Sequence, residues 1–201
     1  MKHRNYSQLL LLPILFSLAN CVNIANNNDK ATPLDQNPYL AGQPEMLPES
    51  KHLFDLAMQA MQDEQWDSAK TYLTQLIDAD PKLSGAILNL GIVATKQQKT
   101  ELAEQYFKQA IDTNKNNLEA YNQLGVLYRS QGKFTLAEET YQQGLAIWDQ
   151  YGPLHYNLGI LYDLYINRPS DALRHYKAFQ ALQEEPDKRV ALWIKTLERK
   201  Q

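Results

Sequence analysis

The sequence lacks most of the residues on which metal and catalytic sites depend. Cys21 is the only cysteine, so the chain cannot form an internal disulfide. No HExxH, GxSxG, Walker-type or GxGxxG motif occurs, and a long strand-like run of alternating β-branched residues is also missing. The pattern therefore argues against a zinc enzyme, a nucleotide-binding enzyme and a β-sheet fold. We expect no catalytic residue, no metal and no cofactor.

Histidine is scarce as well. His52, His155 and His175 remain beyond the first few residues, and they do not have the spacing of a zinc-ligand set. His155 and His175 can approach each other across one pair of helices. Packed or surface imidazoles are the simpler interpretation of both residues.

The amino terminus has the pattern of a secretory signal peptide, predicted over residues 1–20. Lys2 and Arg4 precede an apolar run over residues 9–18, which is too short to span a membrane. Leu-Ala-Asn-Cys at residues 18–21 resembles a bacterial lipobox, in which the cysteine receives diacylglycerol and becomes the new amino terminus. The resemblance implies lipidation of Cys21. Cleavage after Ala19, which would release a soluble periplasmic protein, is the alternative.

The residue after the cysteine and the charge of the chain bear on location and partners. Val22 stands where an Asp typically signals inner-membrane retention, so by this resemblance the chain is expected at the bacterial outer membrane, facing the periplasm. Loss of the signal peptide removes two basic and no acidic residues, which leaves 18 bases against 23 acids. Nucleic acid requires a basic surface, and we therefore expect no nucleic-acid partner.

A tether is predicted over residues 21–49, because it has an Asn-rich beginning and four of the nine prolines. Pro38-Tyr39-Leu40 and Met46-Leu47 are apolar exceptions within it. Three interpretations stay open for them. They dock on the first repeat, they lie in its groove as an internal ligand, or they are incidental parts of a solvated linker.

The remaining chain repeats with a period of 34 residues. Successive columns contain a leucine and then a small residue: Leu56, Leu90, Leu124 and Leu158, followed by Ala57, Gly91, Gly125 and Gly159. Ala69, Ala103 and Ala137 form a later column, which Ala172 rejoins after a one-residue insertion. Apolar stripes at i, i+3, i+4 and i+7 predict two amphipathic helices in each unit. Neither helix pair can bury its apolar face alone, so stacked neighbours must supply the core.

These columns resemble the tetratricopeptide repeat. The third unit matches best, through Tyr121, Leu124, Gly125, Tyr128, Gly132, Ala137 and Tyr141. The resemblance implies an all-α fold, a right-handed α-solenoid of about four helix pairs plus a C-terminal capping helix. We expect repeats at 50–83, 84–117, 118–151 and, in divergent form, 152–185, with the cap at 186–201.

The cap is predicted from an amphipathic pattern after Pro186. Val190, Trp193, Ile194 and Leu197 fall on one helical face, and charged residues fall on the other. A helix of this kind solvates the end of a repeat array. Docking on a partner or on a membrane surface is the alternative.

The resemblance also implies where a partner would bind, because the first helix of each repeat lines a concave face. Ten residues are carried over to this groove: Phe54, Met58, Met61, Leu88, Ile92, Asn122, Val126, Arg129, Tyr156 and Ile160. The ninth residue of every repeat is apolar: Met58, Ile92, Val126 and Ile160. These four residues predict a stripe that binds an apolar or amphipathic protein segment. The alternative is that these side chains sink into the core. A clamp for a terminal carboxylate is not expected, since no paired Lys and Asn residues recur.

The combined patterns predict a membrane-anchored periplasmic scaffold without enzymatic activity, whose partners are proteins of the cell envelope. It resembles small lipoproteins that assist assembly of a type IV pilus or a secretion pore. An adaptor lipoprotein for peptidoglycan hydrolases or a periplasmic protease is the alternative, and an enzyme with an unrecognised site is a third possibility. The oligomeric state stays open.

Overall fold

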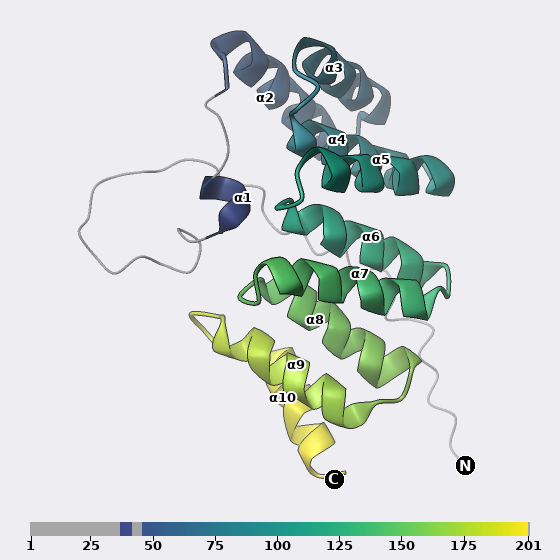
Figure 1. The fold of residues 1–201 in the computed structure, drawn as a ribbon, viewed down its shortest axis with the longest axis vertical. Helices are drawn as coiled ribbons and strands as arrows, with labels where there is room; N and C mark the ends of the chain where they lie inside the picture. The colour runs from purple at the N-terminus through teal and green to yellow at the C-terminus, as the bar shows by residue number, and fades with distance from the viewer. Residues whose placement is uncertain (1–36, 42–45, 201) are drawn as a thin grey trace, which may run out of the picture. The chain divides into compact units, whose positions relative to one another are not determined.

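The structure, a computed structural model, describes residues 37–41 and 46–200, and every regular element in those two ranges is helical (Figure 1). The elements are α1 (Pro38–Ala41), α2 (Pro48–Gln62), α3 (Trp66–Ala79), α4 (Ser84–Lys96), α5 (Thr100–Thr113), α6 (Leu118–Ser130), α7 (Phe134–Ile147), α8 (Gly152–Ile160), η2 (Leu161–Tyr165), α9 (Pro169–Ala181) and α10 (Lys188–Glu198). The predicted signal peptide and Cys21 lie outside the described residues, as does most of the predicted tether. None of the helices in the described ranges is both long and apolar enough to cross a membrane.

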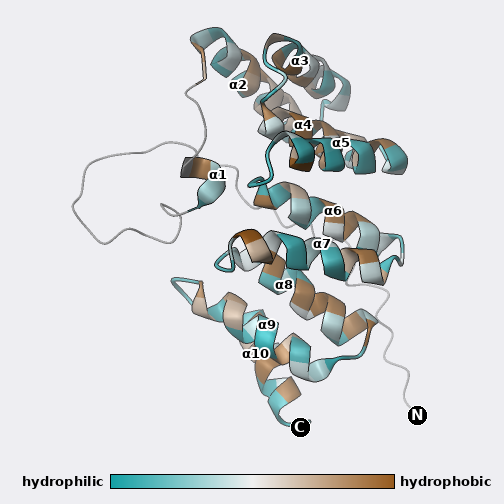
Figure 2. Cartoon of the chain, viewed as in Figure 1, coloured by the Kyte–Doolittle hydropathy of each residue, from teal (hydrophilic) through white to brown (hydrophobic). Residues whose placement is uncertain are grey.

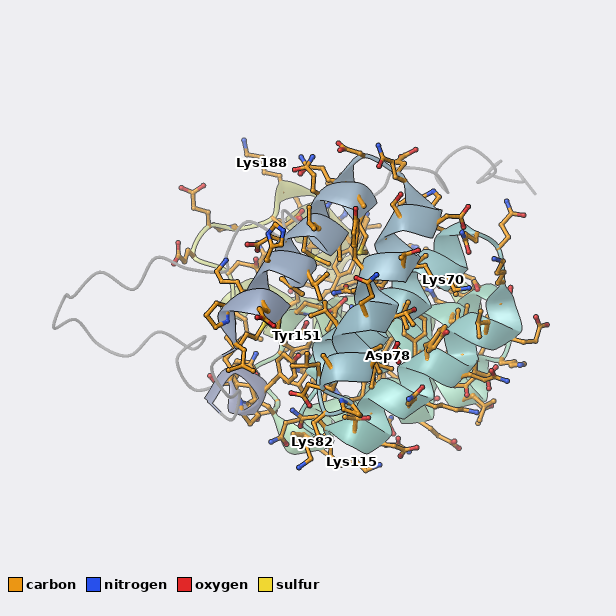
Figure 3. The ribbon with its side chains drawn as sticks, turned by 90° about the horizontal axis from the view of Figure 1, so that it is seen from above. Lys70, Asp78, Lys82, Lys115, Tyr151 and Lys188 are labelled. Carbon is orange, nitrogen blue, oxygen red and sulfur yellow. The ribbon has the colours of Figure 1, made fainter. Side chains whose placement is uncertain are left out.

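The helices from α2 onward pack in pairs, in chain order. The pairs are α2 with α3, α4 with α5, α6 with α7, and α8 and η2 with α9, and each pair packs on the next. The helix α10 packs against α9 at the end of the array. Seen from above, Lys82 and Lys115 lie on the same side of the array, in the loops that join successive pairs (Figure 3). The predicted all-α solenoid is confirmed.

The glycine column explains how the two helices of a pair approach so closely. An added Cβ at Gly91, Gly125 or Gly159 would overlap an aromatic ring of the second helix of the same pair. The rings are those of Phe107, Tyr141 and Tyr176, which are at most 1% exposed. Only a residue without a side chain leaves space for them. In the first repeat the corresponding residues are the smaller pair Ala57 and Leu73, and both are fully buried.

The predicted one-residue insertion in the fourth repeat appears as a π-helical turn. The N–H of Ile166 donates to the carbonyl oxygen of Leu161 over 3.1 Å, a hydrogen bond between residues five apart. A π turn holds one more residue than an α turn and so absorbs an insertion without ending the helix. Ala172 and Tyr176 consequently regain their places in the buried columns.

The core consists of two apolar clusters. One joins α2 and α3 to residues of α4 and contains mainly Ala and Leu. The other runs from α4 to α10 and includes Phe107, Tyr141, Tyr162 and Tyr176. Ile77, Ile92 and Tyr106 pack against both clusters and connect them. Figure 2 shows that α8 is largely hydrophobic, whereas α5 is mainly hydrophilic on the side in view.

A polar clasp joins the later repeats. The hydroxyl of Tyr128 donates to Glu104 over 3.1 Å, and Lys133 approaches the same carboxylate at 3.7 Å. One repeat later, Tyr162 donates to Glu138 over 2.7 Å and Arg168 pairs with it at 2.8 Å. Each clasp connects the second helix of one pair to the first helix, and to the loop after it, in the next pair. It therefore helps to fix the relative orientation of neighbouring repeats.

Candidate functional site on the concave face

The ten predicted groove residues lie on the first helices α2, α4, α6 and α8, and each of them is at least partly buried. Met61, Leu88 and Asn122 are buried, at 7–9% exposure. The others are half-buried: Phe54, Met58, Ile92, Val126, Arg129, Tyr156 and Ile160. The apolar members of this second group also pack against the two core clusters. The stripe therefore combines both interpretations, because its side chains support the core and keep part of their surface accessible.

In the third and fourth repeats the same face carries a connected chain of polar side chains. The Tyr151 hydroxyl donates to the Glu119 carboxylate over 2.6 Å, and the Asn122 amide donates to that carboxylate over 3.3 Å. The Asn157 amide donates to the Asn122 oxygen over 2.8 Å. Arg129 then donates to the Asn157 oxygen over 3.1 Å. Helices α6 and α8 and the loop between α7 and α8 are thus linked by side chains on their concave side.

The electrostatics keep this polar chain in one arrangement. Burial, together with the negative charge of Glu119 and the hydrogen bond to it, raises the pKa of Tyr151 well above its usual range. Tyr151 therefore remains a hydrogen-bond donor at any physiological pH. The Glu119 carboxylate also accepts from Gln123 over 2.6 Å. Its oxygens are held by neighbours, and this part of the face forms a preorganised polar surface.

Sequence reasoning identified Asn122 and Arg129 but did not single out Glu119 or Tyr151 as part of this surface. Glu119 occupies position 2 of the third repeat, a groove position in the family pattern, and this was the signal that could have found it. Tyr151 lies in a loop, and its bond to Glu119 joins residues 32 positions apart. No periodic pattern predicts a pairing of that kind.

The last repeat and the cap form an aromatic end to the face. Tyr156 lies 5.2 Å from Phe179 and 6.1 Å from Trp193, as measured between ring centroids. Trp193 belongs to α10 and also packs on Tyr176 at 5.3 Å. Tyr156 was predicted to face a ligand, and the structure places it beside the capping helix, which contributes to its partial burial.

Two further exposed apolar residues arise from the π turn. Leu164 is 61% and Tyr165 is 39% exposed. The Tyr165 ring lies 5.2 Å from that of Phe134, and the Arg129 guanidinium lies 5.8 Å from the Tyr165 ring. The turn thus places an aromatic side chain beside a predicted groove residue. The 34-residue columns could not predict this placement, because the insertion shifts these residues out of register.

His155 and His175 do meet across the fourth helix pair. Their Nδ1 atoms are 2.9 Å apart, and the Nε2 atom of His155 lies 2.7 Å from the Asp149 carbonyl oxygen. Burial, with smaller contributions from His155 and Arg174, lowers the pKa of His175 to about 4. Burial likewise lowers the pKa of His155. Within the described ranges no three His, Cys, Asp or Glu residues gather as a metal site would require.

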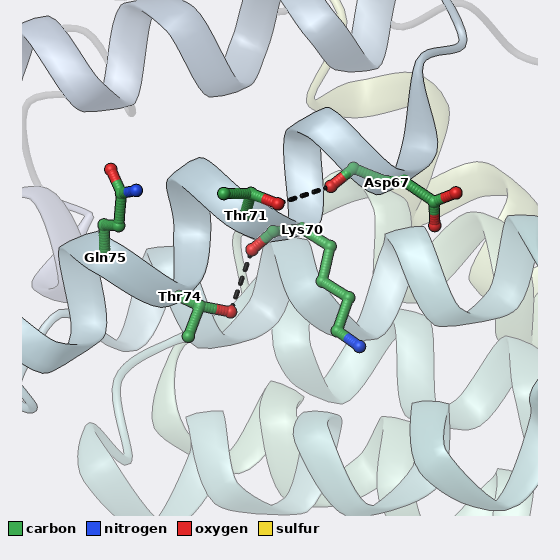
Figure 4. Close-up of a pocket in the computed structure, with 5 residues that line it drawn as sticks. All are labelled: Asp67, Lys70, Thr71, Thr74 and Gln75. Carbon is green, nitrogen blue, oxygen red and sulfur yellow. Dashed lines mark hydrogen bonds between the residues drawn. The ribbon is translucent and has the colours of Figure 1, made fainter.

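A shallow depression on the outer helix α3 does not amount to a binding site. It is lined by Asp67, Lys70, Thr71, Thr74 and Gln75, all of them exposed residues of a single helix (Figure 4). The two threonine hydroxyls donate to backbone oxygens of α3 itself, over 2.9 Å and 2.8 Å. The depression is therefore a solvated helix face, and the concave face remains the better candidate.

Several solved structures are similar to this chain. The structure of pilF from Pseudomonas aeruginosa shares 20% identity and a TM-score of 0.67, covering 75% of this chain and 68% of that one. TTC0263, a thermophilic protein of Thermus thermophilus, shares 19% identity and a TM-score of 0.61, with 75% and 82% coverage. MamA from Desulfovibrio magneticus RS-1, from residue 41 to its end, shares 14% identity and a TM-score of 0.61, with 78% and 87% coverage. At these identities the likeness concerns the fold alone.

The curated proteins contained no significant match to the sequence. Models of the tetratricopeptide repeat, by contrast, match residues 53–82, 83–150 and 116–185, which together make up more than half of the chain. These matches run from within α2 to the end of α9 and so include all four helix pairs, apart from the beginning of α2. The chain belongs to the tetratricopeptide repeat family.

Proposed function

We propose that the chain is a scaffold that binds an apolar or amphipathic segment of a partner protein along the concave face. The observation that carries the proposal is the composition of that face. Half-buried apolar side chains of α2, α4 and α6 continue into the hydrogen-bonded polar surface of α6 and α8. An amphipathic helix or an extended segment with apolar side chains suits both halves. Tetratricopeptide repeats serve protein–protein interaction, and no catalytic step is needed for this role.

The proposed setting is the periplasmic face of the bacterial outer membrane. The support is the order of Lys2 and Arg4, the apolar run 9–18 and the sole cysteine at residue 21. A lipid on Cys21 would hold the repeats near the bilayer, with residues 22–49 as the connection. Lipidation is tested by mass spectrometry of the membrane-extracted protein, and the change Cys21→Ser should release it into the periplasm. Unchanged membrane association of that variant would remove the anchor from the proposal.

Within this setting we propose assistance to the assembly of a type IV pilus or a secretion pore. The support is the combination of a lipoprotein-like leader with a short repeat array, which resembles small assembly lipoproteins. Service as an adaptor for peptidoglycan hydrolases or a periplasmic protease fits the same leader and remains the second candidate. The two differ in the identity of the bound protein.

The test is photo-crosslinking in native envelopes with a photoreactive residue at Ile92. A matched probe at Lys70, on the outer helix α3, serves as the control. We expect the probe at Ile92 to trap a defined protein and the probe at Lys70 not to trap it. A pilus or secretin component would favour the first setting, and a hydrolase or protease would favour the second. Equal capture at both positions would contradict groove binding.

A second measurement separates binding from folding. Changing Ile92 and Val126 together to Glu places two charges on the apolar part of the face, and we expect capture to be lost. Helicity, followed by circular dichroism, should be retained, because both side chains keep part of their surface in solvent. Loss of helicity would show that the two residues act only as core.

A further inference from the structure

The short helix α1 lies beside the first turn of α4, in the second repeat. The hydroxyl oxygen of Tyr39 is 2.8 Å from the position that a Cβ on Gly85 would occupy. Gly85 is in the first turn of α4, and Leu88 and Ile92 follow it at i+3 and i+7, on the same face of the helix. Tyr39 therefore lies at the beginning of the apolar row on which the proposed function depends.

Gly85 is the only glycine at its position among the four repeats. The corresponding residues of the other three repeats are Lys51, Glu119 and Pro153. Glycine in a helix costs about 1 kcal/mol relative to alanine, because it loses more backbone freedom on folding. In α4 its lack of a side chain leaves the space that the Tyr39 hydroxyl occupies, which gives the glycine a packing reason.

The segment that carries Tyr39 has a defined local structure. The backbone N–H of Tyr39 donates to the side-chain oxygen of Asn37 over 2.9 Å, and Asn37 is only 7% exposed. Pro38, with its fixed φ, begins the helical turn. Leu40, in contrast, is 53% exposed. The turn thus presents Tyr39 toward α4 and Leu40 toward solvent.

We infer that residues 37–41, the strap, are a resident occupant of the concave groove, with Tyr39 seated on Gly85. This inference rests on the proposed function, because it means that a partner must displace the strap to reach Leu88 and Ile92. Only residues 42–47 separate the strap from α2, so its effective concentration at the groove is high. The apparent affinity for a partner is then the intrinsic affinity multiplied by the fraction of molecules in which the strap has left the groove.

The first test replaces Tyr39 with p-azidophenylalanine, whose reactive group takes the place of the hydroxyl. The purified full chain is irradiated, digested with trypsin and analysed by mass spectrometry. We expect a cross-link to the tryptic peptide 83–96, which contains Gly85, with a yield that does not depend on protein concentration. The same probe at Leu40 is the control and should not form it. Absence of the link, equal linkage from Leu40, or a yield that grows with concentration would overturn the inference.

The second test acts from the groove side. Gly85→Val fills the space of the Tyr39 hydroxyl and should release the strap, so that chymotrypsin cleaves the bond between Tyr39 and Leu40 several-fold faster. Lys51→Val, at the same position of the first repeat, is the matched control and should leave the rate unchanged. Unfolding is monitored by circular dichroism in both variants. Equal cleavage rates in wild type and Gly85→Val would overturn the inference.

Both tests use the isolated protein, so they judge the strap without any partner. If they fail while the probe at Ile92 still captures a protein, the groove function stands and the strap is wrong. If they succeed while Ile92 captures nothing, even with Tyr39→Ala, the proposed function is wrong. When both ideas hold, Tyr39→Ala should raise capture at Ile92 several-fold.

Discussion

The first repeat and the three later repeats are built on the same period but are held together differently. In the first repeat, Ala57 packs near the aliphatic Leu73, whereas the third repeat sets Tyr141 on Gly125. The bond between Glu138 and Tyr162 cannot form between the first two repeats, where the corresponding residues are Lys70 and Ala94. An exposed hydrogen bond from Gln97 to Asp67, over 2.9 Å, joins those two repeats instead. The later repeats are therefore held by aromatic packing within pairs and by tyrosine–carboxylate bonds between pairs, whereas the first repeat has an aliphatic interior and an exposed polar link to the second.

The turns between paired helices also differ along the array, with the division between the second and third repeats. Four residues at one column have positive φ: Glu64, Gln98, Gly132 and Asn167. Gly and Asn tolerate this left-handed conformation, whereas Glu and Gln pay a steric cost. The first two repeats thus carry strain that the last two avoid. In a linear array with nearest-neighbour coupling, the weaker end opens first, and here that end adjoins the strap.

The largest expected effect comes from the aromatic packing of the third repeat. Gly125→Leu would force a side chain into the ring of Tyr141, and we expect a loss of about 3 kcal/mol in the free energy of unfolding. Chemical denaturation followed by circular dichroism measures it, with Gln75→Leu on exposed α3 as the control. An unchanged melting temperature for Gly125→Leu would refute the close helix pair.

Acid should weaken the fourth repeat through its histidine pair. The folded-state pKa of His175 is about 4 and that of His155 is also lowered, against about 6.5 in the unfolded chain. The unfolded state then binds more protons between these values, so stability falls as pH drops from about 6.5 toward 4. The slope is at most about 1.4 kcal/mol per pH unit for each histidine. The double variant His155→Gln, His175→Gln should lose this part of the pH dependence, and an unaltered profile would contradict it.

The clasp offers a direct comparison between the third repeat and the first. Glu138→Ala removes the acceptor of Tyr162 and the partner of Arg168, and we expect a cost of about 1–2 kcal/mol in the free energy of unfolding. Lys70→Ala, at the same position of the first repeat, should change it by less than about 0.5 kcal/mol. Equal losses in the two variants, measured by urea denaturation, would show that the clasp does not stabilise the third repeat more than the first is stabilised at the same position.

The smallest expected effect concerns the turns. Gln98→Gly removes the strain of a positive φ and should stabilise the protein by about 0.5–1 kcal/mol. The reverse change, Gly132→Gln, should cost a similar amount. Thermal unfolding of the two variants side by side measures the pair. If Gln98→Gly is destabilising, the turns are not a source of weakness in the first repeats.

Comparison of the groove prediction with the structure shows which features periodicity reaches. It placed all ten groove residues on first helices, because position within a helix decides the direction of a side chain. It could not state their exposure, since Leu88 and Ile92 lie on one face yet one is buried and the other half-buried. Exposure depends on neighbouring helices, which the period does not describe.

The sequence by itself determined the repeat, the helix pairs and the insertion in the fourth unit, because these follow from local spacing and from the need of each amphipathic face for a neighbour. Only the tertiary structure decided the bonds of Tyr151 to Glu119 and of Asn157 to Asn122, the contact of Tyr156 with the cap, and the seat of Tyr39 on Gly85. Those contacts join separate elements, some more than thirty residues apart. Their geometry is set by how the repeats stack, and no single helix contains that information.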